Sequence, residues 1–590
     1  VDLANAGEAN KAEIEESARL LEQARTASVP AERMFDVAVA ARVGTVDGGV
    51  ILSEADVTRL ASTPAVTHVI DELRPAHMPA LFPEVFLRSE PGFDVLIGNP
   101  PWEKVQVDER AFWALHFPGL RGLKVSEQKA AMAGYRRDRP DLVASLDAEI
   151  VASDALRRAL LHGDFPGLGS GHPDLYKAFA WRFWRLLRPG GIAGLVMPRS
   201  AVTSSGMAEW RKEIFDFGSY SDVTMLHNTR GWVFPEVHPQ DRFVLLALSK
   251  AQTDEMIIRG PFESELQFVE PKNDPLIADP QEVRGWGVGD ALPWLPSPQS
   301  GPAFVQLTRH DRLGDPGRMD FRFRAVQGDF NATSDAAQFV FDGSGDLPVY
   351  KGASIALWNP DTGVHFASAK SQSIIPASME RRSRQARNRR SAFSELPPDV
   401  ASSQDSLPLL NPRIVFADIT NQSNTRTMIV ALAPPRVVLT HKAPYLLRIR
   451  GSALDEAYLL GVLSSIPLDW YARRYVEKTL SFDILNSFPI PSPPSTSSLR
   501  RRVAQVTGRL AAVDKRYAAW AAEVEVPVGS VQTQSEKEDL LAELDAVVSL
   551  LYGLTEDQVE HVFDTFHRGW NYQSRLEAVL EHYTRWKGQA

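Results

Sequence analysis

The sequence predicts an α/β protein with a doubly wound core, followed by a mixed α/β region and a helical C-terminal region. Two segments carry this prediction. Phe93 and Val95 to Ile97 form a short apolar run bounded by Gly92 and Gly98, which is typical of a buried parallel strand. Residues 171–200 give helix, Pro-Gly-Gly turn and apolar strand in succession, the alternation of a doubly wound sheet. Because 590 residues exceed what one core holds, we expect several domains.

Composition narrows the class of protein. Hydrophobic residues make up 44% and charged residues 23%, which is ordinary for a globular chain. The formal net charge is −10, so any nucleic-acid surface must be a local concentration of Lys and Arg. The chain has 0 cysteines, which excludes disulfides, thiolate metal sites and cysteine nucleophiles and fits a reducing compartment. We expect a cytoplasmic protein without membrane segments, because no apolar run is long enough to span a bilayer.

Other elements follow from local patterns. Residues 9–26 predict an amphipathic helix, with Ile14, Ala18, Leu21 and Ala24 on one face. Helices are also predicted over 125–163 and 206–216, and a strand over 243–248. From residue 255 onward, short strand-like runs at 412–420, 425–434 and 436–447 indicate an irregular β-rich region. Residues 488–498 predict a Pro/Ser linker, and 499–524 and 536–590 are again helical.

The tetrapeptide Asn99-Pro100-Pro101-Trp102 directly follows the first strand, where ligands bind in open α/β sheets. The prolines stiffen the loop and leave carbonyl groups free to accept hydrogen bonds. Asn99 adds a side-chain oxygen, and Trp102 adds a flat apolar face. Two acceptors beside a stacking surface suit the exocyclic amine of a planar base, and an amine held in this way becomes a better nucleophile. An isolated Asn-Pro-Pro would indicate only a turn, but the flanking strand and α/β pattern favour a functional loop.

The segment FDVLIGNPPWEKV (93–105) resembles motif IV of the gamma-class N6-adenine DNA methyltransferases. Later segments are similar to the large methylases of type IIG restriction–modification systems and of the BREX and DISARM phage-defence systems, with DISARM-like methylases the most similar. These segments are GHPDLYKAF (171–179) and residues 186–215, 227–250, 412–447, 458–491 and 540–566. The resemblance covers about residues 80–566.

The resemblance implies a Rossmann-like methyltransferase core that transfers a methyl group from S-adenosylmethionine to N6 of an adenine flipped out of duplex DNA. Asn99 and the Pro100 carbonyl would hold the amine within the Asn99-Pro100-Pro101-Trp102 site, and Trp102 would stack on the base. Double-stranded DNA is the implied partner, and other subunits of a defence system are candidate partners. The implied regions are a helical lead-in, a catalytic core, a target-recognition domain and a helical C-terminal region, at 1–90, 91–254, 255–490 and 491–590.

One part of the family pattern is missing before the motif. A strand, a Gly-rich loop and a helix should bind the donor upstream of residue 99. The Gly cluster at 43–52 does not run from a strand into a helix, and GLGSG (167–171) follows the motif. We therefore expect that the chain starts between the donor-binding half and motif IV, that the core is incomplete at its N-terminal side, and that the donor-binding residues cannot be assigned.

DNA contacts are expected from local positive charge. The segment ERRSRQARNRR suits a phosphate-contacting loop, with a solvated, disordered tail as an equal alternative. Arg426, Thr427 and Lys442 either reach DNA or support the fold. The expected phosphate-contacting arginines are Arg381, Arg382, Arg384, Arg387, Arg389 and Arg390.

Two further types of site are weighed. The pattern Pro140-Asp141 with Glu149 superficially resembles a metal nuclease but lacks the following Lys, so a solvated helix face is favoured, and no metal site is predicted. His227 and His238 are interpreted as structural or near the base pocket.

Three functions therefore compete at this point. The first is an adenine-specific DNA methyltransferase. The second is a DNA-recognition fragment that binds duplex but is inactive alone. The third, an RNA or protein (glutamine) methylase, is disfavoured by the long recognition-like region.

Overall fold

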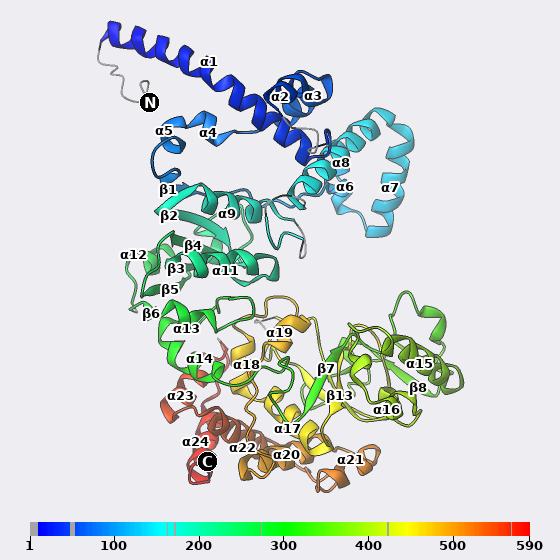
Figure 1. Cartoon of the computed structure of the whole chain (residues 1–590). Coiled ribbons are helices and arrows are strands. Elements are labelled where there is room, and N and C mark those ends of the chain that lie inside the picture. The colour runs from blue at the N-terminus through cyan, green and yellow to red at the C-terminus, as the bar shows by residue number, and fades with distance from the viewer. Residues whose placement is uncertain are drawn as a thin grey trace. The chain divides into compact units, whose positions relative to one another are not determined.

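The computed structural model describes residues 10–47, 53–161, 163, 165–169, 173–272, 274–421, 424–567 and 569–589. The chain divides into two compact units. Unit 1 comprises residues 1–284 and 289–292, and unit 2 comprises residues 285–288 and 293–590. Figure 1 shows the helices and strands of both units.

Unit 1 is built on a six-stranded mixed sheet with the strand order β1-β2-β4-β3-β5-β6. Strands β1, β2, β3 and β5 run in one direction, and β4 and β6 run against them. The C-terminal ends of β1, β2 and β3 therefore point toward the same edge of the sheet. The strands are β1 (Phe93–Gly98), β2 (Leu187–Pro198), β3 (Ser219–His227), β4 (Arg242–Ser249), β5 (Met256–Phe262) and β6 (Leu276–Ala278).

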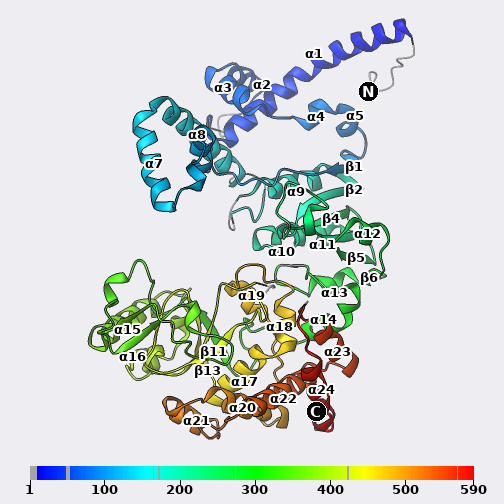
Figure 2. The same cartoon turned by 180° about the vertical axis from the view of Figure 1, so that it is seen from behind.

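Several helices precede this sheet in the sequence, and two that lie between its strands pack on it, α9 against β2 and α11 against β3. Helices α6, α7 and α8 enclose a small core of their own around Trp113 and Leu146. The short helix α10 follows β2 directly and is visible in Figure 2. The helices of unit 1 are α1 (Lys11–Arg42), α2 (Glu54–Ala61), α3 (Pro64–Leu73), α4 (Met78–Leu81), α5 (Pro83–Phe86), α6 (Glu109–His116), α7 (Val125–Asp138), α8 (Pro140–Leu161), α9 (Leu175–Leu186), α10 (Ser200–Thr203), α11 (Ala208–Phe217), α12 (Glu265–Val269) and α13 (Pro280–Arg284).

The extent of one helix, one strand and the sheet in unit 1 differs from the sequence prediction. Helix α1 continues sixteen residues past the predicted end at residue 26. Pro30 lies inside it and removes one backbone donor, but the helix continues beyond it. Strand β2 includes the predicted Pro-Gly-Gly turn, since Gly191 lacks the Cβ that would lie 2.8 Å from the Phe93 carbonyl oxygen. Strands β5 and β6 belong to the same sheet as β1, so the sheet extends beyond the expected domain boundary at residue 254.

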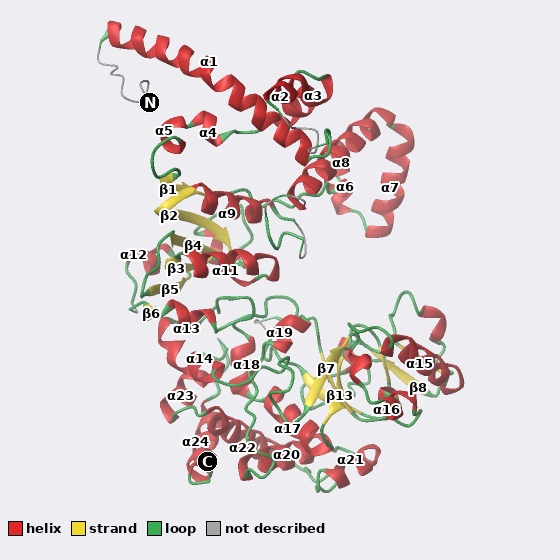
Figure 3. Cartoon of the chain, viewed as in Figure 1, coloured by secondary structure: helices red, strands yellow, loops and turns green. Residues whose placement is uncertain are grey.

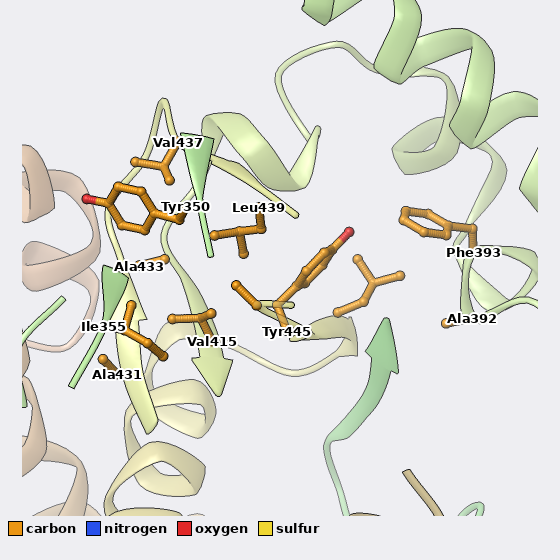
Figure 4. Close-up of a cluster of buried hydrophobic side chains, with 12 residues drawn as sticks. Tyr350, Ile355, Ala392, Phe393, Val415, Ala431, Ala433, Val437, Leu439 and Tyr445 are labelled. Carbon is orange, nitrogen blue, oxygen red and sulfur yellow. The ribbon is translucent and has the colours of Figure 1, made fainter. Parts of the chain in front are cut away.

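Unit 2 contains two small sheets joined by long loops, as Figure 3 shows. One sheet has the order β11-β10-β13-β7 and the other has the order β12-β8-β9. Buried side chains from both sheets, among them Val415, Leu439 and Tyr445, form the cluster drawn in Figure 4. The strands are β7 (Arg322–Val326), β8 (Leu347–Tyr350), β9 (Ala367–Ala369), β10 (Arg413–Phe416), β11 (Val430–Ala433), β12 (Val438–Leu439) and β13 (Tyr445–Arg450).

The second half of unit 2 is helical and has α17 at its centre. This helix is apolar around most of its circumference and buried, because β10, β11 and α20 all pack on it. The helices of unit 2 are α14 (Gly301–Thr308), α15 (Ser371–Ala386), α16 (Pro398–Ser402), α17 (Ala453–Ser464), α18 (Ile466–Ala472), α19 (Phe482–Asn486), α20 (Ser498–Ala511), α21 (Ala518–Glu523), α22 (Gln534–Tyr552), α23 (Glu556–Asp564) and α24 (Gln573–Lys587).

The predicted fold class is confirmed: a mixed α/β chain with a six-stranded sheet, further sheets and a helical C-terminal region. The predicted linker at 488–498 is irregular, as expected, but its first residues are not a free linker. Phe488 and Ile490 are fully buried, and the hydroxyl groups of Tyr552 and Tyr458 donate to the carbonyl oxygens of Pro489 and Pro491. Proline carbonyl groups are free to accept these bonds because the ring removes only the donor.

Candidate functional site

The loop that carries Asn99 begins where β1 ends. Gly98 is the last residue of the strand, and a Cβ there would lie 2.8 Å from Cζ of Phe183 on α9. The absence of a side chain at this position lets β1 approach the helix closely. Asn99 is exposed and Pro100 is buried. The side-chain amide of Asn99 is therefore accessible to solvent, while Pro100 fixes the loop to the interior.

Trp102 lies among aromatic side chains from distant parts of the sequence. Its ring is 5.0 Å from that of Phe243 at an interplanar angle of 41°, and 6.0 Å from that of Phe234 in an edge-on arrangement at 87°. The ring is half-buried, and its Nε1 is buried without an acceptor among the described residues. An unsatisfied buried donor costs about 1–3 kcal/mol, so an acceptor brought by a ligand or water would stabilise the site.

The chain after Trp102 is fixed by the start of α9. The amide of Leu175 donates to the Glu103 carbonyl oxygen at 2.9 Å, and the amide of Val105 donates to that of Pro173 at 3.3 Å. Two sequence segments of the resemblance, 93–105 and 171–179, thus lie side by side. Residues 171 and 172 of the second segment lie outside the described residues.

Sequence reasoning assigned no role to Phe234 or Phe243. Phe243 is the second residue of β4, and Phe234 lies in the loop between β3 and β4. Both belong to the segment 227–250, but more than 130 residues separate them from Trp102. No local spacing could therefore predict the contact. His227 ends β3 beside Glu263, at 3.5 Å, and His238 is exposed in the same loop.

The sequence predicts a buried strand here, but β1 is an edge strand of the sheet with a neighbour on one side only among the described residues, so part of it is exposed. Val95 is 56% exposed and Ile97 is 83% exposed, and both lie on one face of the strand because they are two residues apart. An exposed apolar edge offers unpaired backbone groups and side chains to another strand. In the described residues before β1 the structure contains helices and no strand, and of the Gly cluster at 43–52 only residues 43–47 are described.

The nuclease-like pattern lies on a helix, as the favoured interpretation expected. Asp141 and Glu149 are both exposed on α8. The Arg139 guanidinium donates to the Asp141 carboxylate and lowers its pKa to about 2. Among the described residues, no group of three or more His, Asp or Glu side chains is arranged to hold a metal ion.

The first part of the arginine-rich segment is neither a loop nor a disordered tail, because α15 continues to residue 386. Arg381 forms an ion pair with Asp335 at 2.8 Å. Arg382 is only 2% exposed and donates to Ser406 Oγ and to the Ser403 carbonyl oxygen. These bonds from its Nη atoms hold α15 to residues 403–406 and disfavour the phosphate contact predicted for Arg382. The arginines that the structure leaves exposed are Arg384, Arg387, Arg389 and Arg390.

Arg426 also supports the fold. Its Nε donates to the Asp469 carboxylate at 2.5 Å, and its side chain is 11% exposed. Asp469 is fully buried and also accepts from the amides of Thr427 and Met428. These contacts favour the fold-supporting alternative for Arg426 and Thr427 over a DNA contact. Lys442 is exposed, so its predicted DNA contact stays a prediction.

Comparisons with known proteins give fold-level similarity to restriction–modification enzymes. No family model and no curated protein matches the chain. The type IIL restriction-modification enzyme MmeI in complex with DNA aligns at 12% identity and a TM-score of 0.37, over 90% of this chain and 64% of that enzyme. A nuclease-deletion mutant of the type ISP enzyme LlaGI in complex with a DNA substrate mimic aligns at 11% identity and a TM-score of 0.30, over 77% and 48% of the two chains. The type IIG restriction endonuclease BpuSI aligns at 14% identity and a TM-score of 0.24, over 68% and 52%.

At these identities and TM-scores, the similarity assigns no residue of this chain a role. The chain spans less than two thirds of the length of each of these enzymes. None of the helices in the described part of the chain has both the length and the apolarity that crossing a bilayer demands.

Proposed function

We propose that this chain is the base-binding and target-recognition part of a site-specific DNA methyltransferase that methylates N6 of adenine in duplex DNA, within a restriction–modification or phage-defence system. The observation that carries the proposal is the geometry of the Asn99-Pro100-Pro101-Trp102 loop. Asn99 is exposed at the C-terminal end of β1, and the partly exposed ring of Trp102 contacts two aromatic rings. Ligands bind at this edge of an α/β sheet.

In this proposal, the chain's own residues bind and orient the base. The Asn99 side-chain oxygen and the Pro100 carbonyl oxygen accept the two protons of the N6 amine. Trp102 stacks on the flipped adenine, and a water molecule supplies an acceptor for the buried Nε1. Holding both protons on acceptors directs the nitrogen lone pair out of the ring plane.

S-adenosylmethionine is the proposed methyl donor, but the described residues do not fit a complete donor site. No strand–loop–helix unit precedes β1 in the described residues. We propose that a donor-binding part aligns a strand with the exposed edge of β1, where Val95 and Ile97 supply apolar surface. That part would place the donor beside the same end of the sheet as Asn99.

The proposal is tested with Asn99→Ala, with Gln106→Ala as a matched control on an exposed polar residue of the same loop. Methylation is followed with labelled donor in the presence of the donor-binding part, and duplex affinity is measured separately. Loss of one acceptor made to the reacting group should lower kcat by about 100-fold. The Kd for duplex should change little, because phosphate contacts dominate affinity. Near-normal N6 methylation by Asn99→Ala would refute the role of this loop.

A second candidate function is a DNA-recognition fragment that is inactive alone, and the exposed β1 edge favours it for the isolated chain. Calorimetry separates the two. We expect weak or no binding of S-adenosylmethionine to residues 1–590 alone. Micromolar affinity would mean that the donor site is contained in this chain.

A further inference from the structure

Asn228 occupies the start of the loop that joins β3 to β4. Its side chain is fully buried and makes four hydrogen bonds, all to the backbone of the same loop. The Nδ2 group donates to the carbonyl oxygens of Phe234 at 2.9 Å and Val237 at 3.0 Å. The Oδ1 atom accepts from the amides of Val233 at 3.1 Å and Phe234 at 3.0 Å. Both donors of the amide are used, and its oxygen accepts twice.

The backbone of Asn228 fixes the same loop. Its amide donates to the Asp241 carbonyl oxygen at 3.0 Å, and its carbonyl oxygen accepts from Gly231 at 2.7 Å. Arg230, between them, has φ 60°, the left-handed region that a non-glycine residue enters at a cost of about 1–2 kcal/mol. The loop therefore adopts a conformation that its own residues do not favour and that Asn228 stabilises.

Phe234 is the residue that this network holds most directly, since Asn228 bonds both its amide and its carbonyl group. Phe234 and Phe243 also contact each other edge-on, with ring centroids 5.0 Å apart at 83°. Phe243 is fixed by its place in β4, opposite Pro198 of β2. Of the two rings that support Trp102, only Phe234 depends on a loop.

We infer that Asn228 is a positioning residue for the base pocket: through Phe234 it sets the tilt of the Trp102 ring. This inference rests on the proposed function, because the tilt affects turnover only if Trp102 stacks on the target base. A displacement of about 1 Å in a positioned reactant can lower the rate by about 100-fold. Loosening the loop should therefore act on turnover more than on duplex binding.

The test uses Asn228→Asp, which keeps an acceptor for the two amides but removes both donors and sets a carboxylate oxygen against the carbonyl oxygens of Phe234 and Val237. Asn411→Asp is the matched control, because Asn411 Nδ2 also donates to two carbonyl oxygens, of Asp405 and Leu407, but lies in unit 2. We expect kcat to fall about 10-fold or more in Asn228→Asp with a near-constant KM for duplex, and no change in kcat in Asn411→Asp.

A second measurement does not depend on methylation. The chain is labelled with 5-fluorotryptophan, and the Trp102 resonance is identified by its loss in Trp102→Phe. Asn228→Asp should shift or broaden this resonance, and Asn411→Asp should not. If Asn228→Asp does not fold, Phe234→Leu replaces it, since it removes the ring contact and leaves the backbone bonds to Asn228.

The outcomes separate the inference from the proposed function. If the wild-type enzyme methylates adenine and the loop variant changes neither kcat nor the Trp102 resonance, the inference is overturned. If the resonance responds but the wild-type enzyme, with its donor-binding part, transfers no methyl group, the proposed function fails while Asn228 still positions Trp102. If both the resonance and kcat respond, the inference is supported.

Discussion

Replacing Arg426 with methionine should destabilise unit 2 rather than alter DNA recognition. Methionine keeps most of the apolar stem of the side chain but removes the charge that pairs with Asp469. Asp469 would retain the amides of Thr427 and Met428 and the longer contact with Arg473 Nε at 3.6 Å. The carbonyl oxygens of Ser464 and Ser465 would lose the donor that Arg426 gives them.

The size of the effect follows from burial. Removing one partner of a buried ion pair costs about 3–5 kcal/mol, because the other charge stays buried without compensation. Since Arg473 still lies beside Asp469, we expect the lower end, about 3 kcal/mol. That corresponds to a loss of about 150-fold in the folding equilibrium constant, at 1.4 kcal/mol for each factor of ten. With an m-value of about 3 kcal/mol/M, the urea midpoint should fall by about 1 M.

Urea unfolding monitored by tryptophan fluorescence measures the change. The control is Arg436→Met, because Arg436 pairs with Asp346 at 3.0 Å in the same unit but 57% of its side chain is exposed. An exposed pair of this kind contributes about 0–1 kcal/mol, so the control midpoint should hardly move. Equal midpoints for the two variants, or a changed recognition sequence in folded Arg426→Met, would show that Arg426 does not act as a buried support.

Further predictions concern the edge strand, the arginines and one buried carboxyl group. Ile97→Lys should reduce concentration-dependent self-association of the isolated chain in analytical ultracentrifugation, because a lysine on an edge strand opposes strand pairing. Unchanged association would mean that the chains do not associate through the edge of β1. Neutralising the four exposed arginines, Arg384, Arg387, Arg389 and Arg390, should reduce the slope of log K for duplex against log salt concentration by about one for each lost phosphate contact. The methylated sequence should stay unchanged. Arg382→Gln, in contrast, should lower the free energy of unfolding. A constant slope would show that these four arginines are only solvated. Burial raises the pKa of Glu456 from 4.5 to about 7, against the opposing effects of Arg448 and the Trp520 donor. The folded state therefore binds this proton more tightly than the unfolded state, so the stability that Glu456 contributes is complete below pH 4.5 and is lost, by about 3 kcal/mol, as the pH rises to 7. In Glu456→Gln the denaturation midpoint should depend less on pH between 4.5 and 7. An equally strong pH dependence in the variant would assign the titration to another group.

The parts of the fold that could be predicted from the sequence are those with local signals. The apolar run bounded by two glycines located β1, and the alternation over 171–200 located α9 and β2. Strand β3 was not predicted as an element, because residues 219–227 mix polar and apolar side chains without a clean period. The sequence does not place β5 and β6 in the first sheet, because β5 joins it by pairing with β3, more than 30 residues upstream, and β6 joins it only through β5.

The candidate site shows the same division between local and distant information. The place of Asn99 at a strand end follows from four consecutive residues and the strand before them. The aromatic rings around Trp102 belong to Phe234 and Phe243, more than 130 residues later in the sequence, and nothing in their spacing indicates a contact. A local motif therefore suggests candidate ligand-binding residues, but not the side chains that pack around them.

The cationic residues demonstrate why charge alone is a poor guide to a DNA surface. Arg382 and Arg384 are two residues apart on one helix, yet the first is buried against residues 403–406 and the second is exposed. Arg426 lies in a polar segment, and its partner Asp469 lies 43 residues later on α18, with no local pattern to connect them. An arginine in a polar segment becomes a phosphate contact only if the fold supplies no buried acceptor for it. Because that acceptor is set by tertiary packing, the sequence could count the arginines but could not divide them between the two roles.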